Sequence, residues 1–149
     1  MSDATARGDS FPPHDDAAEA ALLRDPATGW YHDWYLRLRL EEEVARAARH
    51  ERSLSLVVLR AAGGDDVNRR RLQVALAAFA ATGLRATDLP CLTSQGDYVI
   101  VLPETDLAGA EVVASRLRES LTGFEPHTGT ATYADGLTAG ALLEAERRG

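Results

Sequence analysis

The sequence contains one cysteine, Cys91, and this scarcity excludes a framework of internal disulfides. Cys91 lies in a short apolar segment with no adjacent cation that would lower the pKa of its thiol. We therefore expect a buried, inert thiol. A chain without disulfides is typical of a reducing compartment, which favours a cytoplasmic location.

The sequence also lacks an excess of basic residues and any long apolar run. Its 16 Lys and Arg residues against 23 Asp and Glu residues give a net charge of −7, which argues against nonspecific nucleic-acid binding. No run is long enough to cross a bilayer, and the N-terminus has no signal-peptide pattern. The histidines have no metal-ligand spacing, and no nucleophile arrangement is recognisable, so the sequence predicts no metal site and no conventional catalytic site.

A length of 149 residues favours one domain with a single core. Residues 1–16 are rich in Asp, Ser, Gly and Pro and predict a disordered tail. The domain is expected over residues 17–149. It begins with a short lead-in helix over residues 17–24, which Asp25-Pro26 terminates.

Hydrophobic periodicity within the domain predicts alternating helices and strands. The predicted helices are Trp34–Arg52, Val67–Thr82, Leu107–Leu121 and Thr138–Arg148. The predicted strands are Leu54–Leu59, Leu89–Leu92, Tyr98–Leu102 and Thr128–Tyr133. Gly83 suits the C-cap of the second helix, and Asp106 suits the N-cap of the third. The order of elements predicts an α/β (α+β) sandwich of ferredoxin-like type, with a mostly antiparallel central sheet flanked by helices.

The segment Arg85–Thr105, RATDLPCLTSQGDYVIVLPET, is the most informative part of the chain. It contains Arg-x-x-Asp as Arg85 and Asp88, then two apolar runs separated by a polar turn, with Leu102-Pro103 at the end. Apolar runs on both sides of a Gly-Asp turn predict a β-hairpin. This arrangement resembles the centre of a GGDEF domain, the bacterial diguanylate cyclase family, and the resemblance implies the palm-type fold of that family.

The turn itself departs from the family signature. It reads, without a gap, Ser94, Gln95, Gly96, Asp97, Tyr98. Side chains in place of the two glycines would crowd a triphosphate, and the metal-binding acid becomes Gly96. The family's first strand ends in a metal-binding Asp, where this chain has Leu59-Arg60, and its phosphate-facing lysine aligns with Glu146. The guanine-binding stretch after that strand is shortened. These losses predict an inactive domain with no cofactor and no metal.

Arg85 and Asp88 stand in the position of the family's inhibitory site for cyclic di-GMP, and Arg116 aligns with an arginine that the site recruits from the following helix. The resemblance therefore implies a cyclic di-GMP receptor. Two simpler interpretations remain open. Arg85 and Asp88 could form only an ion pair that closes a helix, and Arg116 could be a solvated surface residue.

Three other interpretations stay open at this stage. The stretch Gly63–Asp66 could be a displaced phosphate or metal site, although it precedes a helix rather than lying in a hairpin turn. Aromatic residues gather at the start of the first long helix, where core packing or a dimer surface is favoured over base stacking; they are Trp30, Tyr31, Trp34 and Tyr35. The alternative function is a nucleotide-independent scaffold for a protein partner or a homodimer.

Overall fold

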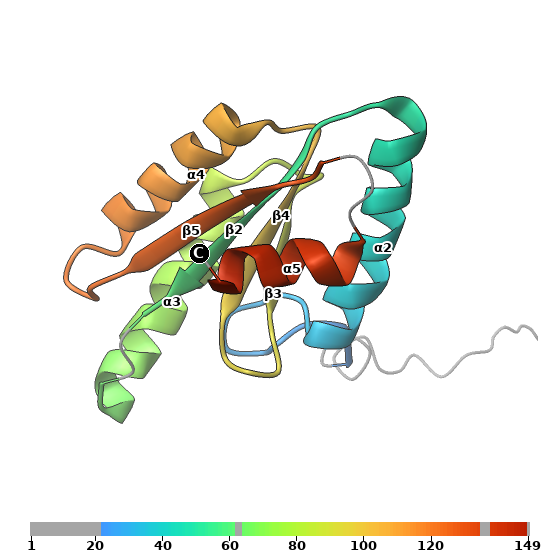
Figure 1. Cartoon of the computed structure of the whole chain (residues 1–149). Helices are drawn as coiled ribbons and strands as arrows, with labels where there is room; N and C mark the ends of the chain where they lie inside the picture. The colour runs from blue at the N-terminus through green and yellow to red at the C-terminus, as the bar shows by residue number, and fades with distance from the viewer. Residues whose placement is uncertain (1–21, 62–63, 135–137, 149) are drawn as a thin grey trace, which may run out of the picture.

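The chain folds into a four-stranded sheet with helices on both faces (Figure 1). The computed structural model describes residues 22–61, 64–134 and 138–148. The strands are β2 (Leu54–Arg60), β3 (Leu89–Leu92), β4 (Tyr98–Pro103) and β5 (His127–Thr132). The helices are α2 (Asp33–His50), α3 (Asp66–Gly83), α4 (Leu107–Ser120) and α5 (Ala139–Arg148). The order of these elements is the one predicted.

The strands lie in the order β3-β4-β2-β5, and every neighbouring pair is antiparallel. Central strand β2 pairs Leu56 with Val101 of β4 on one side and with Ala131 of β5 on the other. Because α3 and α4 each connect two strands, the sheet acquires the crossed order of a ferredoxin-like sandwich. The predicted fold class is confirmed.

Two apolar cores lie on opposite faces of the sheet, because β2 is apolar on both. Val57 and Leu59 pack with residues of α3 and α4, whereas Leu56 and Val58 pack with residues of α2 and α5. Figure 1 shows the same division, with α5 in front of the sheet and α3 and α4 behind it. The sandwich therefore has three layers.

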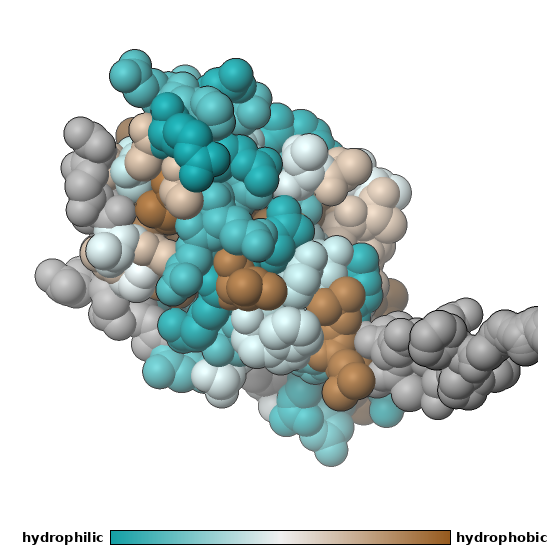
Figure 2. Space-filling view, turned by 90° about the vertical axis from the view of Figure 1, so that its right-hand side faces the viewer, coloured by the Kyte–Doolittle hydropathy of each residue, from teal (hydrophilic) through white to brown (hydrophobic). Residues whose placement is uncertain are grey.

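Helix α2 ends at His50, two residues before the predicted end. Glu51 adopts a left-handed conformation with φ of 53°, and its backbone N–H bonds to the carbonyl of Ala47. Figure 2 shows the side of the molecule that carries α2 in Figure 1, where apolar surface occurs as separate patches between polar residues. Trp34 and Leu38 on this helix are 53% and 50% exposed.

Gly83 is the last residue of α3, and the C-cap is Leu84. The prediction that Gly83 caps this helix is therefore wrong. Leu84 follows in an extended conformation, so no left-handed residue ends this helix. A Cβ atom at Gly83 would lie 2.9 Å from Cε1 of Phe79, a core side chain. Glycine is therefore used here because the Phe79 ring packs against the backbone.

The hairpin between β3 and β4 is one residue longer than a two-residue turn. Thr93 and Asp97 face each other, with the N–H of Thr93 bonded to the Asp97 carbonyl at 2.8 Å, and Ser94–Gly96 form the loop. Gly96 has φ of 91°, which a glycine adopts without strain. This is the three-residue hairpin loop with glycine in its left-handed position.

The predicted tail, residues 1–16, lies outside the described residues, as does most of the predicted lead-in helix. Of that helix, Leu22 and Leu23 are helical, and Arg24 forms a β-bridge with Tyr31. Tyr31 in turn bridges Cys91 and covers the free edge of β3. No helix within the described ranges is both long enough and apolar enough to span a bilayer.

Candidate functional site

Arg85 and Asp88 lie in the loop that joins α3 to β3. The Asp88 carboxylate accepts the backbone N–H of Arg85 at 2.8 Å, and the Asp88 N–H bonds back to the Arg85 carbonyl at 3.0 Å. The guanidinium of Arg85 donates to both oxygens of the same carboxylate, through Nη2 at 2.9 Å and Nε at 3.4 Å. The ion pair expected from the sequence is present, in a loop rather than at a helix end.

The Arg85 side chain also ties this loop to the end of β4. Its Nη2 atom donates to the Pro103 carbonyl at 2.9 Å and to the Thr105 hydroxyl at 2.8 Å. The Asp88 side chain is only 3% exposed, whereas that of Arg85 is 55% exposed. A buried carboxylate thus holds an arginine whose outer edge still faces solvent.

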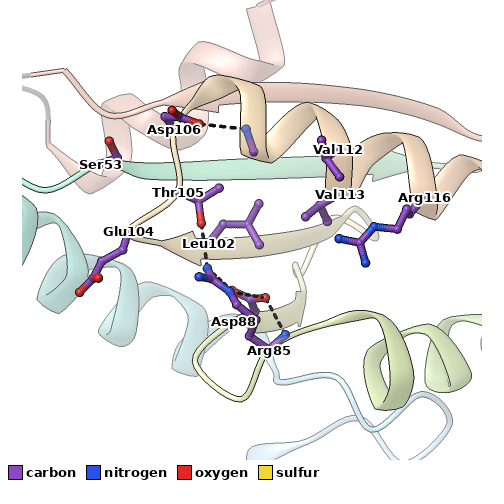
Figure 3. Close-up of a pocket in the computed structure, with 11 residues that line it drawn as sticks. Ser53, Arg85, Asp88, Leu102, Glu104, Thr105, Asp106, Val112, Val113 and Arg116 are labelled. Atoms are coloured by element: carbon purple, nitrogen blue, oxygen red, sulfur yellow. Dashed lines mark hydrogen bonds and ion pairs between the residues drawn. The ribbon is translucent and has the colours of Figure 1, made fainter.

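Arg116 reaches the same place from α4. Arg85, Asp88 and Arg116 line one pocket of about 450 Å³, together with Thr105 and the apolar wall of Val112 and Val113. Figure 3 shows the Arg116 side chain extending from α4 and the Arg85 side chain extending from the loop before β3, so the two come from different elements that border the pocket. The structure therefore brings together all three residues that the sequence selected.

Neighbouring Arg118 has a different environment. Its Nη1 donates to the hydroxyl of Thr128 on β5, and it does not line the pocket. Arg116, in contrast, has no ion pair with any residue in the described part of the chain. The two arginines of α4 thus differ in their contacts, which their spacing in the sequence did not reveal.

The acidic residues of the pocket already have partners. Glu104 pairs with Arg52 at 3.1 Å, and Asp106 caps α4 by accepting the Gly109 N–H at 2.9 Å. Asp88 is neutralised by Arg85. Asp106 keeps its negative charge at the N-terminus of α4, and Arg116 is the lining cation without a carboxylate partner among the described residues, so the pocket offers a local anion-binding position at Arg116. Sequence reasoning did not identify Thr105 as a contact of Arg85, because no spacing rule links them.

The signature turn lies at the other end of β4 from this pocket. Asp97 forms an ion pair with Arg60 at 3.5 Å, and Tyr98 packs edge-on against Trp30 with ring centroids 5.4 Å apart. Burial raises the pKa of the Tyr98 phenol. Leu59, at the end of β2, is 1% exposed in the core. A guanidinium and an apolar side chain therefore occupy this end of the sheet.

The two carboxylates of the Gly63–Asp66 stretch, considered above as a displaced phosphate or metal site, both have partners in the first turn of α3. Asp65 caps α3 by accepting the N–H of Asn68 at 2.8 Å, and Asp66 pairs with Arg69 at 2.9 Å. Gly63 lies outside the described residues, as does the side chain of Glu146. Over the ranges that the structure describes, no three His, Cys, Asp or Glu side chains form a group that could hold a metal.

The aromatic residues before and within α2 divide into two kinds. Trp30 is fully buried, and its Nε1–H donates to the Leu76 carbonyl at 3.0 Å, so its role is core packing. Trp34 is exposed, and Tyr31 and Tyr35 stack at 4.5 Å between their centroids. Cys91 is buried as expected, and burial raises the pKa of its thiol well above the ordinary value.

Comparison with known proteins places this geometry in a structural family, although no family model and no curated protein matches the sequence. The diguanylate cyclase SiaD of Pseudomonas aeruginosa, solved with its activator SiaC, is 28% identical over 88% of this chain, with a TM-score of 0.68. This chain spans 60% of the SiaD chain.

Two further structures are more distant in sequence but similar in shape. The GGDEF domain of DgcB from Caulobacter crescentus, solved with cyclic di-GMP, is 12% identical with a TM-score of 0.76 over 91% of this chain and 88% of that chain. A microbial GGDEF domain with a novel mode of cyclic di-GMP interaction is 19% identical with a TM-score of 0.75, over 87% and 88%. By its fold, the chain is a GGDEF-like domain.

Proposed function

We propose that this chain is a catalytically inactive GGDEF-like domain that binds cyclic di-GMP through Arg85, Asp88 and Arg116. The convergence of these residues on one pocket carries the proposal. A guanidinium donates two parallel hydrogen bonds to a phosphate or to the edge of a guanine, and it can stack on a base. The cyclic di-GMP in the DgcB structure supports the same ligand class for this fold.

The three residues have different roles in the proposal. Arg116, which has no ion pair within the described ranges, supplies the charge for a phosphate. Arg85 presents the exposed edge of its guanidinium to a guanine or to the second phosphate. Both oxygens of Asp88 already bond to Arg85, so the first role of Asp88 is to orient that arginine.

The proposed inactivity depends on the opposite end of β4. Phosphoryl transfer between nucleotides needs carboxylates that hold Mg²⁺ and a cation on the phosphates. Here Leu59 is apolar, and Asp97 pairs with Arg60. The residues Ser94 and Gln95 add side chains where the family has glycines. Incubation with GTP and Mg²⁺, followed by chromatography of the nucleotides, is expected to yield no cyclic di-GMP; turnover would contradict this part of the proposal.

Titration calorimetry with cyclic di-GMP tests the binding site. Arg85→Ala and Arg116→Ala are each expected to weaken binding by about 10- to 100-fold, because a charge-assisted hydrogen bond contributes about 1.5–3 kcal/mol. Arg85→Lys should fall between Arg85→Ala and the unmodified protein, since it keeps the charge but not the planar fork.

Arg118→Ala is the matched control, because it removes an arginine of the same helix that does not line the pocket. It should bind like the unmodified protein. The absence of any heat at tens of micromolar protein, or an equal loss in Arg116→Ala and Arg118→Ala, would refute the site.

A second candidate function is a scaffold for a protein partner or a homodimer, independent of nucleotide. The exposed Trp34 and Leu38 on α2 favour it, and SiaD was solved with a protein activator. It predicts a complex or a homodimer whose stability does not change with cyclic di-GMP. Light scattering after size-exclusion chromatography measures this, and a protein that stays monomeric and binds no partner would count against it.

A further inference from the structure

A groove follows the N-terminal half of α3, at the far end of this helix from the Arg85 loop. Its volume is about 760 Å³, and it lies between α3 and Phe124, which follows α4. Val67 and Val74 line it and are 69% and 64% exposed. Residues seven apart lie on one face of a helix, so the two valines and Ala75 form a continuous apolar strip beside Phe124.

Three arginines of α3 lie between Val67 and Val74, next to this apolar strip. Arg69, Arg70 and Arg71 are consecutive, and Arg69 is neutralised by Asp66 at 2.9 Å. The guanidinium of Arg71 lies 5.8 Å from the centroid of the Phe124 ring, an arrangement that holds the cation at the groove. Arg70 is exposed and has no ion pair within the described ranges. Among the described residues, Arg70 and Arg71 thus have no carboxylate partner, so two cations stand at the groove of a chain whose net charge is −7.

We propose that this groove binds an acidic segment of a partner protein, with an apolar side chain seated between Val67 and Val74 and flanking carboxylates paired with Arg70 and Arg71. The charge at the groove is opposite to that of the whole chain, which selects a negatively charged partner. A nucleic acid is disfavoured because the rest of the surface repels it. A second copy also carries −7, and the oligomeric state measured below separates it from an acidic partner segment.

The groove is independent of the proposed nucleotide site. It is formed by the first three turns of α3, whereas Arg85 follows the last turn. The first turns of α3 are the bright green helix at the lower left of Figure 1. A partner could therefore occupy the groove while the Arg85 pocket is filled, and failure of one site does not imply failure of the other.

Selection from a random 16-residue peptide library displayed on phage tests this inference with the complete chain as bait. Enriched peptides are expected to combine Asp or Glu with Leu, Ile or Phe. The enriched peptides, made synthetically, should lose at least tenfold in affinity for Arg70→Glu and for Val74→Ser. Versions with Lys in place of Glu should show the reverse preference and bind Arg70→Glu more tightly than the unmodified protein.

Matched controls use α2, where Arg49→Glu and Leu38→Ser make the same changes on another exposed helix. They should leave peptide affinity unchanged, and circular dichroism establishes that all variants are folded. The inference is overturned if no peptide is enriched, if the enriched peptides are not acidic, or if their binding survives both groove variants. A homodimer that Val74→Ser dissociates would also overturn it, because the occupant would then be a second copy.

Discussion

At the scale of single residues, Arg85 has a structural role and, in the proposed function, a recognition role as well. Three of its hydrogen bonds go to Asp88, Pro103 and Thr105, so the protein fixes its orientation before any ligand arrives. A side chain ordered in advance does not lose rotamer entropy on binding, which favours affinity. The same bonds join the α3–β3 loop to the end of β4, so Arg85→Ala should also loosen this loop.

Cys91 yields a prediction on alkaline stability. Burial raises the pKa of its thiol in the folded protein, whereas an unfolded thiol releases its proton near pH 8.5. Above that pH the unfolded chain binds fewer protons than the folded chain, so the stability falls as the pH rises. We expect urea unfolding to show a loss approaching about 1.4 kcal/mol per pH unit between about pH 9 and pH 10.

Cys91→Ala is the control for this prediction. It should be less stable at neutral pH because it leaves a small cavity, but its stability should be nearly constant over the same pH range. The Tyr98 phenol, whose pKa is also raised, adds to the loss only at higher pH. Equal pH dependence in the two proteins would show that the thiol is not responsible.

Residue-scale prediction from the sequence succeeded where contacts are local. Arg85 and Asp88 are three residues apart, so their pairing follows from spacing. The inward direction of Arg116 required the register of α4, which the resemblance to the family supplied. The contact between Arg85 and Thr105 spans 20 residues and depends on how a loop and a strand end meet. No pattern in the sequence carries that information.

At the scale of elements, α3 and α4 begin in the same way. Asp65 caps α3 and Asp106 caps α4, each through its carboxylate to a backbone N–H three residues later. Asp65→Ala and Asp106→Ala should each lower the free energy of unfolding by about 1 kcal/mol, as for other lost N-caps. Urea titration followed by circular dichroism measures both.

Serine is the restoring variant for these caps. Asp65→Ser and Asp106→Ser should recover most of the loss, because a hydroxyl also accepts the N–H bond. Asp106 borders the proposed nucleotide pocket whereas Asp65 does not, so only Asp106→Ala should alter cyclic di-GMP binding. If alanine at either position costs nothing, the capping bond contributes no stability.

The helices and strands were predictable because the spacing of apolar residues along the chain reflects which side chains are buried. The strand Leu54–Arg60 is buried on both faces and reads as an apolar run, and α4 shows an apolar stripe after its cap. The ends were less predictable. Glu51 ends α2 in a conformation that glycine usually adopts, and Gly83 is required by the Phe79 ring rather than by a turn. Neither position follows from hydrophobic periodicity: Gly83 is set by a ring one turn earlier in α3, and Glu51 by the local backbone that ends α2.

At the scale of the whole molecule, β4 separates two regions with different side-chain environments. At its Pro103 end, the pocket holds the Arg85–Asp88 ion pair together with Arg116, which has no ion pair among the described residues. At its Tyr98 end, the Arg60 guanidinium faces Asp97, and the neighbouring Leu59 is buried in the core. Because these regions are about 16 Å apart along a five-step strand, a substitution at one end should leave the geometry of the other end unchanged.

This separation leads to a prediction for the complete domain. A ligand that binds only the folded protein raises its stability, by about 2.7 kcal/mol when the free concentration is 100 times Kd. For a chain of this length that corresponds to a rise in Tm of roughly 5–10 °C. Thermal unfolding should show this rise with cyclic di-GMP, a much smaller rise in Arg85→Ala at the same concentration, and the full rise in Asp97→Asn, which changes only the Tyr98 end. A rise that Asp97→Asn abolishes and Arg85→Ala preserves would move the ligand to the signature turn and leave the Arg85 pocket a purely structural joint.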